Sequence, residues 1–209
     1  MILPFVFTMK LKNGNKIILA SASPRRKELL EREGLSFDVL VPQTEEISDI
    51  RAEPKRLVTE NARLKAESVA RENPNRPVLG ADTIVCLNGK IYGKPKDVGE
   101  AKTMLAELQG KTHSVFTGVC AAMSDGGGNV RTLLDAQESR VTFKELDSAA
   151  IDEYIANVNV LDKAGSYAAQ EFGSMIIEKI DGAFDNVMGL PVNLAKKILD
   201  RLVSISQSL

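Results

Sequence analysis

Short apolar runs alternate with longer amphipathic stretches along the chain, and this alternation predicts strands and helices in turn. The run at 16–20 is typical of a strand covered on both faces. Asn88-Gly89 lies between two apolar runs, which is a strong signal for a hairpin turn. We therefore expect strands over 16–20, 36–42, 112–123, 130–143 and 174–180, and a hairpin over 77–95.

Helix signals occupy the segments between these runs. Pro24, Pro54 and Pro191 suit first helical positions, because proline lacks the N–H that a helix start leaves unpaired. Asp97 is a good N-cap, and Asp147 or Ser148 offers another. These signals predict helices over 24–33, 54–71, 97–108, 147–157 and from 191 onward. The stretches 160–173 and 181–190 are predicted to be loops, and Leu57, Leu64 and Val69 to face inward.

Alternating strands and helices with two hairpins favour an α/β fold with a mixed, twisted sheet flanked by helices. We expect one domain over 16–209 and an extension over 1–15. That extension lacks a basic stretch and a small-residue cleavage site, so a signal peptide is disfavoured. No run of about 18 apolar residues is present to span a membrane.

Composition narrows the possible partners. The 209 residues carry a formal net charge of −1, which gives no overall attraction to nucleic acid or membrane. Any anion site must therefore be local. Cys86 and Cys120 lie in apolar runs without metal-ligand spacing, which favours reduced thiols and a cytoplasmic location.

Two arginines stand where a helix would tolerate them least. Ser23 and Pro24 look like an N-cap and first residue, and Arg25 and Arg26 follow directly. Because a helix N-terminus is partly positive, each cation there is unfavourable by about 0.3–1 kcal/mol. Two explanations stay open: pairing with Glu28 and Glu31 on the next turn, or an anionic ligand bound at this helix end.

Other polar residues also break the local pattern. Asp82 interrupts an apolar strand, where an unpaired carboxylate would be costly. It could cap a loop or bind a cation. Further candidates have ordinary surface readings when taken singly; they are Glu46, Lys65, Lys94, Asp162 and Lys163. Together these groups offer clustered cations, two hard oxygen ligands and a base, which is what cleavage of a polyphosphate requires.

Seven motifs resemble the Maf family of nucleotide pyrophosphatases in order and spacing. They are ILASASPRRKELL, TEE, LKA, GADTIVCLNGKIYGKP, HSVFTGV, DKAGSYAAQ and NVMGLP, within 16–204. The resemblance implies an elongated, two-lobed fold similar to the inosine triphosphate pyrophosphatases, with a central cleft. It also implies hydrolysis of a nucleoside triphosphate to the monophosphate and pyrophosphate, with Mg²⁺ or Mn²⁺ as cofactor, and a homodimer.

Residue by residue, the resemblance implies specific roles. Asp82 matches the proton acceptor, and Glu46 and Asp82 match metal ligands. The substrate-binding set is Ser23, Arg26, Lys65, Lys94, Asp162 and Lys163.

Three further positions resemble the branch that acts on dTTP and UTP: Arg25, Thr83 and Gln170. Glutamine offers both a donor and an acceptor, as the uracil or thymine edge requires. Two alternatives remain, namely a 7-methyl-GTP pyrophosphatase of the same family and a non-catalytic nucleotide-binding regulator of cell division.

Overall fold

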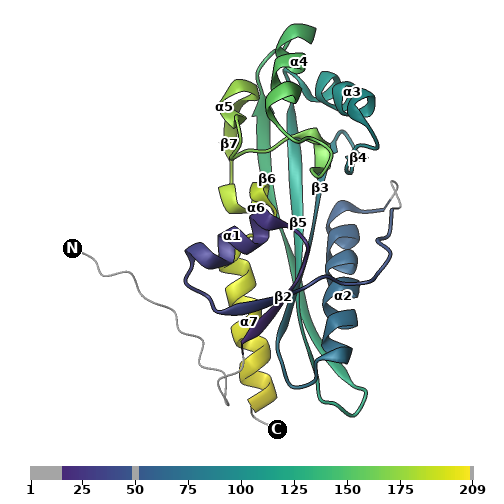
Figure 1. The fold of residues 1–209 in the computed structure, drawn as a ribbon, viewed down its shortest axis with the longest axis vertical. Coiled ribbons are helices and arrows are strands. Elements are labelled where there is room, and N and C mark those ends of the chain that lie inside the picture. The colour runs from purple at the N-terminus through teal and green to yellow at the C-terminus, as the bar shows by residue number, and fades with distance from the viewer. Residues whose placement is uncertain (1–15, 49–51, 208–209) are drawn as a thin grey trace, which may run out of the picture.

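A single mixed sheet runs along the long axis of the molecule (Figure 1). The computed structural model describes residues 16–48 and 52–207. The strand order is β2-β1-β3-β5-β6-β7, and β4 pairs with β3. β1 lies parallel to β2 and β3, whereas the other four pairings are antiparallel, so the predicted mixed sheet is confirmed. The strands are β1 (Ile17–Ala20), β2 (Phe37–Leu40), β3 (Val78–Leu87), β4 (Lys90–Tyr92), β5 (Thr112–Ser124), β6 (Val130–Phe143) and β7 (Ile177–Asp181).

Helices cover both faces of this sheet. In Figure 1, α1 and α7 stand on one side of the central strands and α2 on the other, while α3 and α4 lie at the upper end. None of the described helices is long and apolar enough to cross a bilayer. The helices are α1 (Pro24–Arg32), α2 (Pro54–Glu72), α3 (Val98–Leu108), α4 (Ser148–Asn157), η2 (Ala164–Ser166), α5 (Gly173–Ile176), α6 (Phe184–Met188) and α7 (Val192–Gln207).

The core is divided between the two ends of the molecule. At the lower end, Val119 packs in the cluster beneath α7, while its neighbour Cys120 packs beneath α2, because successive strand residues point to opposite faces. At the upper end, Leu105 of α3 and Tyr154 of α4 belong to a separate cluster. Separate core clusters at the two ends of one continuous sheet give the elongated, two-lobed form that the resemblance implied.

Two glycines let α2 lie unusually close to the sheet. A Cβ at Gly80 would lie 2.5 Å from the carbonyl oxygen of Ala62, and one at Gly118 would lie 2.4 Å from that of Val58. Any side chain at either position would therefore push the helix away. The close approach matters for function, because it brings polar side chains of α2 to the middle of β3.

Several predicted elements are confirmed, including the Asn88-Gly89 hairpin between β3 and β4. Asp147 rather than Ser148 caps α4, since its carboxylate accepts the N–H of Ala150. Ser23 occupies the N-cap of α1, but its side chain makes no capping hydrogen bond.

Three predictions of secondary structure were wrong. Residues 164–166, expected in a loop, form the short helix η2. Residues 174–176, expected in a strand, belong to α5, and β7 begins only at Ile177. Residues 184–188, expected in a loop, form α6. Asp185 stabilises that short helix by accepting the N–H of Val192, a contact with the start of α7 that local sequence does not reveal. The expected extension, residues 1–15, lies outside the described residues.

Candidate active site

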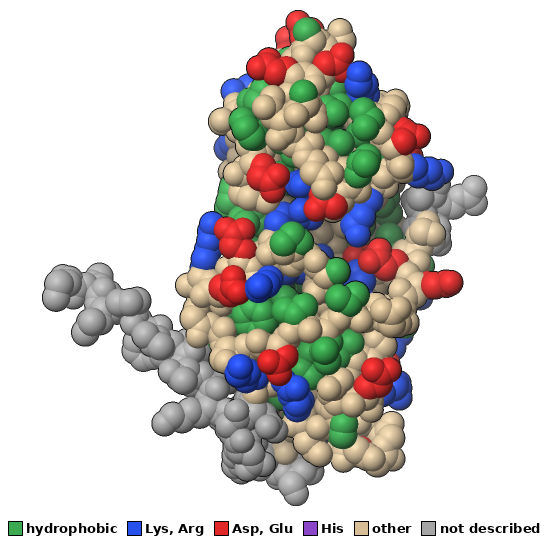
Figure 2. Space-filling view, in the orientation of Figure 1, with side chains coloured by type: hydrophobic (Ala, Val, Ile, Leu, Met, Phe, Trp, Pro, Cys, Tyr) green, Lys and Arg blue, Asp and Glu red, His purple; other side chains and the backbone are tan. Residues whose placement is uncertain are grey.

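A cavity of about 610 Å³ lies between the two lobes. Its walls come from segments that are far apart in the sequence, including the start of α1, the middle of α2 and β3, and the loop after α4. Figure 2 shows acidic and basic side chains gathered across the middle of this face. All eleven predicted site residues line the cavity; they are Ser23, Arg25, Arg26, Glu46, Lys65, Asp82, Thr83, Lys94, Asp162, Lys163 and Gln170.

β3 contributes two consecutive residues that face different helices. Asp82 points towards α2, where it contacts Lys65, whereas Thr83 points to the opposite face, where it contacts Arg26. This division follows from the two-residue period of a strand. Gly118, directly across from Asp82 on β5, carries no side chain and lets α2 approach. One strand thus serves both walls of the cavity.

Lys65 is the centre of an ionic cluster in which Lys65 and Asp82 are buried and Glu46 is partly exposed. Its Nζ lies 2.7 Å from Asp82 Oδ1 and 2.7 Å from Glu46 Oε1. Because both oxygens contact the same nitrogen, Asp82 Oδ1 and Glu46 Oε1 must lie close to each other. Lys65 and Asp82 are each only 7% exposed, so their pairing is needed to offset the cost of burying charge.

The pKa of Glu46 lies below its usual value. Partial burial alone would raise it, but the hydrogen bond and charge of Lys65 outweigh burial, with help from Lys94 and Arg26. Glu46 is therefore a carboxylate at neutral pH. A deprotonated oxygen ligand is what a divalent cation requires.

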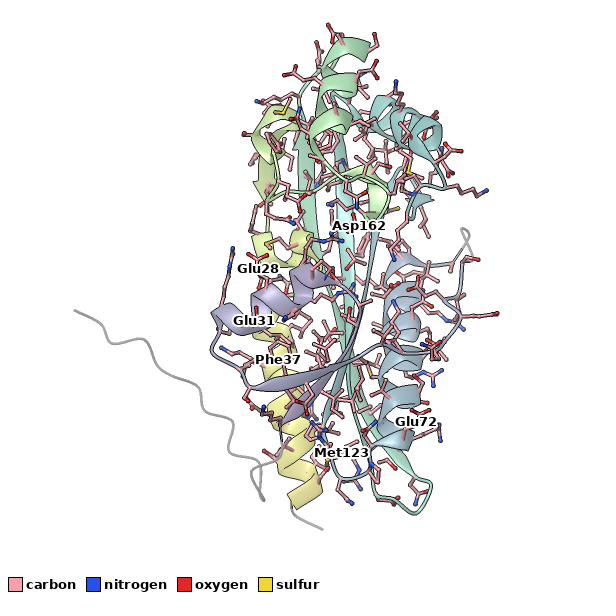
Figure 3. All side chains as sticks on the ribbon, viewed as in Figure 1. Glu28, Glu31, Phe37, Glu72, Met123 and Asp162 are labelled. Atoms are coloured by element: carbon pink, nitrogen blue, oxygen red, sulfur yellow. The ribbon has the colours of Figure 1, made fainter. Side chains whose placement is uncertain are left out.

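The two arginines of α1 turn towards the cavity and not along their own helix. Glu28 and Glu31 (Figure 3) pair instead with Arg32 and Lys27. The pairing of the arginines with the next turn is therefore excluded. Arg25 reaches across the cavity, with its Nη1 2.9 Å from Asp162 Oδ2 and its Nη2 3.2 Å from the Asp162 carbonyl oxygen.

Arg26 is held more firmly. Its Nε donates to the carbonyl oxygen of Gly189 at 2.8 Å, and its Nη1 donates to Ser21 Oγ at 3.2 Å. Its Nη2 donates to Thr83 Oγ1 at 3.1 Å. Burial lowers the pKa of Arg26, although the nearby Asp82 carboxylate opposes that shift. Guanidinium has five N–H donors, so one donor remains on each terminal nitrogen for an anion in the cavity.

The upper wall carries a second ionic group. Lys163 Nζ lies 2.8 Å from Asp162 Oδ1 and 2.6 Å from the carbonyl oxygen of Asn159. Burial would raise the pKa of Asp162, but the hydrogen bonds of Lys163 and Arg25 more than reverse this and lower it. Lys94 is exposed at the rim and forms no ion pair with any residue that the structure describes.

Gln170 carries a polar atom without a partner. Its Nε2 donates to Glu171 Oε1 at 3.2 Å. Its Oε1 is buried and accepts no hydrogen bond from any described residue. A buried acceptor left unpaired is costly, so a cavity ligand with an N–H donor would relieve that cost.

Sequence reasoning missed four residues that hold this site together. Asn61 donates to Asp82 Oδ2 at 3.1 Å and fixes the loop at Ile47 through both of its amide atoms. Ser21 accepts the N–H of Ser23 in addition to Arg26. Thr117 and Asn186 support Thr83 from β5 and α6. The signal that could have found Asn61 is its polar side chain on the inner face of α2, where apolar residues are expected.

The arrangement defines a class of site. Paired carboxylates and several basic side chains face one cavity between the lobes of a mixed α/β sheet. Such a set binds an anion with several charges and offers oxygen ligands for a hard cation.

Comparison with known proteins agrees. Residues 16–202 match the family described as Maf-like protein, and the chain belongs to this family. A dTTP/UTP pyrophosphatase from Akkermansia muciniphila is 47% identical over 186 residues, covering 89% of this chain and 96% of its own. A dTTP/UTP pyrophosphatase from Bacillus cereus is 46% identical over 182 residues, covering 87% of each chain.

Similarity to solved structures is weaker. A dITP/XTP pyrophosphatase from Mycobacterium abscessus is 15% identical, with a TM-score of 0.41, covering 62% of this chain and 74% of that one. This likeness is too distant to carry an argument about the present chain.

Proposed function

We propose that the protein is a nucleoside triphosphate pyrophosphatase that hydrolyses dTTP and UTP to the nucleoside monophosphate and pyrophosphate. The observation that carries the proposal is the convergence of Glu46 and Asp82 on one lysine, inside a cavity that Arg26 also enters. The names of the two relatives support the same substrates.

The triphosphate is proposed to bind along the basic side chains. Arg26 offers two unused N–H donors, and Lys94 and Lys163 offer ammonium groups on the upper side of the cavity. The N-terminus of α1 adds a favourable dipole at the same place. These charges also offset the negative charge that develops on the leaving pyrophosphate. A triphosphate bound here would explain why two arginines stand at the N-terminus of α1, where the helix itself disfavours positive charge.

Asp82 is the proposed base. A water molecule attacks the α-phosphorus, and a new P–O bond forms there while the bond from the α-phosphorus to the α–β bridging oxygen breaks. Asp82 accepts the proton of the water, and pyrophosphate leaves. Lys65 and Asn61 each hold one oxygen of the Asp82 carboxylate, which fixes its orientation.

The residues present fit a divalent cation. Mg²⁺ uses one or two carboxylates together with phosphate oxygens and water. Glu46 and Asp82 supply the carboxylates, and no larger group of metal-ligating side chains occurs within residues 16–48 and 52–207. When bound, Mg²⁺ or Mn²⁺ would neutralise phosphate charge and increase the acidity of bound water. Substrate phosphates would complete the set of ligands.

Base selection is proposed to involve Gln170. Its unpaired Oε1 suits the ring N–H of uracil or thymine, and its amide group can turn to offer a donor. Arg25 also lines the cavity, where it forms an ion pair with Asp162. A homodimer, a cytoplasmic location and the absence of nucleic-acid or membrane partners stay predictions.

A nucleotide panel tests the proposal. The purified protein is incubated with dTTP, UTP, CTP or 7-methyl-GTP, with Mg²⁺, with Mn²⁺ or with EDTA, and pyrophosphate is measured. We expect release from dTTP and UTP that EDTA abolishes. Turnover of 7-methyl-GTP alone would favour the other branch of the family. Binding of dTTP without turnover under any metal condition would favour a non-catalytic regulator.

A further inference from the structure

Arg26 is supported by a chain of hydrogen bonds that runs through the sheet. Its Nη2 contacts Thr83 Oγ1 at 3.1 Å, and Thr83 Oγ1 lies 3.0 Å from Thr117 Oγ1. Thr117 Oγ1 in turn lies 3.0 Å from the carbonyl oxygen of Asn186. Thr83 and Thr117 are directly opposite each other on β3 and β5, so their side chains share one face.

The two ends of this hydrogen-bond chain set a preferred direction for its hydroxyl protons. A carbonyl oxygen can only accept, so Thr117 donates its hydroxyl proton to Asn186. Thr83 has one hydroxyl proton and two acceptors, Thr117 Oγ1 at 3.0 Å and the carbonyl oxygen of Gly189 at 3.5 Å, and the shorter contact favours donation to Thr117. The lone pairs of Thr83 are left facing Arg26, whose guanidinium can only donate. Hydrogen bonds aligned in one direction polarise and strengthen one another.

The far end of this hydrogen-bond chain, at Asn186, is held in place by further hydrogen bonds. Asn186 is fully buried, and its Nδ2 donates to Val115 O at 3.1 Å and to Ser139 Oγ at 3.0 Å. These bonds attach α6 to β5 and β6. Gly189, just after α6, supplies the carbonyl that accepts Arg26 Nε. Two contacts of Arg26 therefore depend on the position of α6, one directly and one through the threonines.

We propose that Thr117 is a positioning residue for the triphosphate site, which acts through Thr83 to hold the Arg26 guanidinium towards the phosphates. Thr117 is fully buried and lies behind Thr83, so it acts through its hydrogen bonds and not by touching the ligand. The inference rests on the proposed function and adds a residue to it. It also gives Thr83 a role in phosphate binding in place of base reading.

Paired variants separate this role from a structural one. Thr117→Val keeps the shape and removes the hydroxyl, whereas Thr117→Ser keeps the hydroxyl. Thr112→Val is a matched control, because Thr112 forms a similar hydroxyl pair with Thr142 between β5 and β6 outside the cavity, at 2.8 Å. The readouts are the dissociation constant of dTTP by calorimetry, kcat/KM for dTTP and UTP, and the urea midpoint of unfolding.

We expect Thr117→Val to weaken dTTP binding and kcat/KM roughly tenfold, equally for dTTP and UTP, because Arg26 contacts phosphate and not the base. Thr117→Ser and Thr112→Val should match the parent. In an Arg26→Lys background the effect of Thr117→Val should disappear, since residues that act through one another are not additive. An unchanged loss in that background, or an altered preference between dTTP and UTP, would overturn the proposal.

Three further outcomes keep the test decisive. If Thr117→Val does not fold, Thr83→Val interrupts the same hydrogen-bond chain at a half-buried position, with Thr83→Ser as its control. The loss of dTTP binding in Thr83→Val should likewise disappear in the Arg26→Lys background. If the parent binds dTTP without hydrolysing it, the proposed function fails while the binding constants still test Thr117. If the parent does not bind dTTP, both are overturned.

Discussion

Two cations on α2 stand two residues apart, and each lies between two carboxylates. Arg63 pairs with Glu60 and Glu67 at 2.7 and 2.9 Å, which are neighbours one turn away on the same helix. Lys65 pairs with Glu46 and Asp82, which come from a loop and from β3. The side chain of Arg63 is 33% exposed, and that of Lys65 is 9% exposed.

The same chemistry therefore has different consequences in the two places. Exposed pairs within one helix contribute little to stability, because water screens them and side-chain entropy opposes them. In the Lys65 cluster, Lys65 and Asp82 are buried against the sheet, and the fold brings all three members together. Grouping buried charges is costly, so a ligand that uses them is the simplest reason for their presence.

The largest difference between the two clusters is expected when one acid in each is neutralised. Asp82→Asn should lower kcat for dTTP by at least about a hundredfold, because a general base typically contributes 10²–10⁴-fold. Its control, Glu60→Gln, should keep the parent rate. Pyrophosphate release measures both. Turnover by Asp82→Asn at the parent rate would show that Asp82 is not the base.

The second-largest difference is expected in stability, when Lys65 and Arg63 are each replaced by methionine. Lys65→Met leaves two carboxylates facing each other without a cation, and we expect it to lower the free energy of unfolding by about 3 kcal/mol. Arg63→Met should cost less than about 1 kcal/mol. Urea unfolding of the two variants gives both values. Equal losses would mean that burial does not distinguish the clusters.

The comparison also shows what sequence could predict. The pairs of Arg63 follow from helical spacing, and the hairpin at Asn88-Gly89 follows from turn chemistry. The Lys65 cluster depends on how closely α2 approaches the sheet, which no local pattern encodes. Leu64 was expected to face inward on α2 but is only half-buried, whereas Lys65 beside it is buried. A polar residue on an inner helical face is ordinarily read as a surface residue.

Most of the site residues were singled out as polar or charged breaks in the local pattern, and the motif resemblance assigned their roles and added Thr83 and Gln170. The structure brings them to one cavity without testing those roles. Their supports were not found. Asn61, Thr117 and Asn186 act through contacts between elements, and hydrogen bonds of Asp185 and Asn186 hold α6 against α7, β5 and β6. Such tertiary contacts override the loop-like sequence of 181–190.

Another buried group, which has no opposing charge beside it, sharpens the comparison. His113 packs against Phe143 and Tyr167, and burial lowers its pKa to about 4. The unfolded chain binds a proton near pH 6.5, whereas the folded chain does not. Stability should therefore be full above pH 6.5 and fall by roughly 2 kcal/mol as pH drops to about 4.5.

His113→Phe should flatten that part of the profile, whatever its effect at neutral pH. Thermal unfolding midpoints between pH 4.5 and 7 measure the slope. An identical slope in parent and variant would mean that the chain's single histidine is protonated without cost.

The smallest effect is expected at Glu46, whose side chain is 49% exposed. Its pKa is lowered in the folded state, so its contribution is present above about pH 4.5 and is lost as pH falls below that value. Glu46→Gln should flatten the stability profile slightly between pH 4.5 and 3. If stability fell more steeply with decreasing pH in Glu46→Gln than in the parent, the lowered pKa of Glu46 would be contradicted.

The central claim is that this cavity cleaves a nucleoside triphosphate between its α and β phosphates. Phosphorus NMR of dTTP incubated with the parent and Mg²⁺ tests it most directly, because the products identify the bond that breaks. We predict dTMP and pyrophosphate in equal amounts, and no such signals with Asp82→Asn on the same timescale. Formation of dTDP and inorganic phosphate would contradict the account.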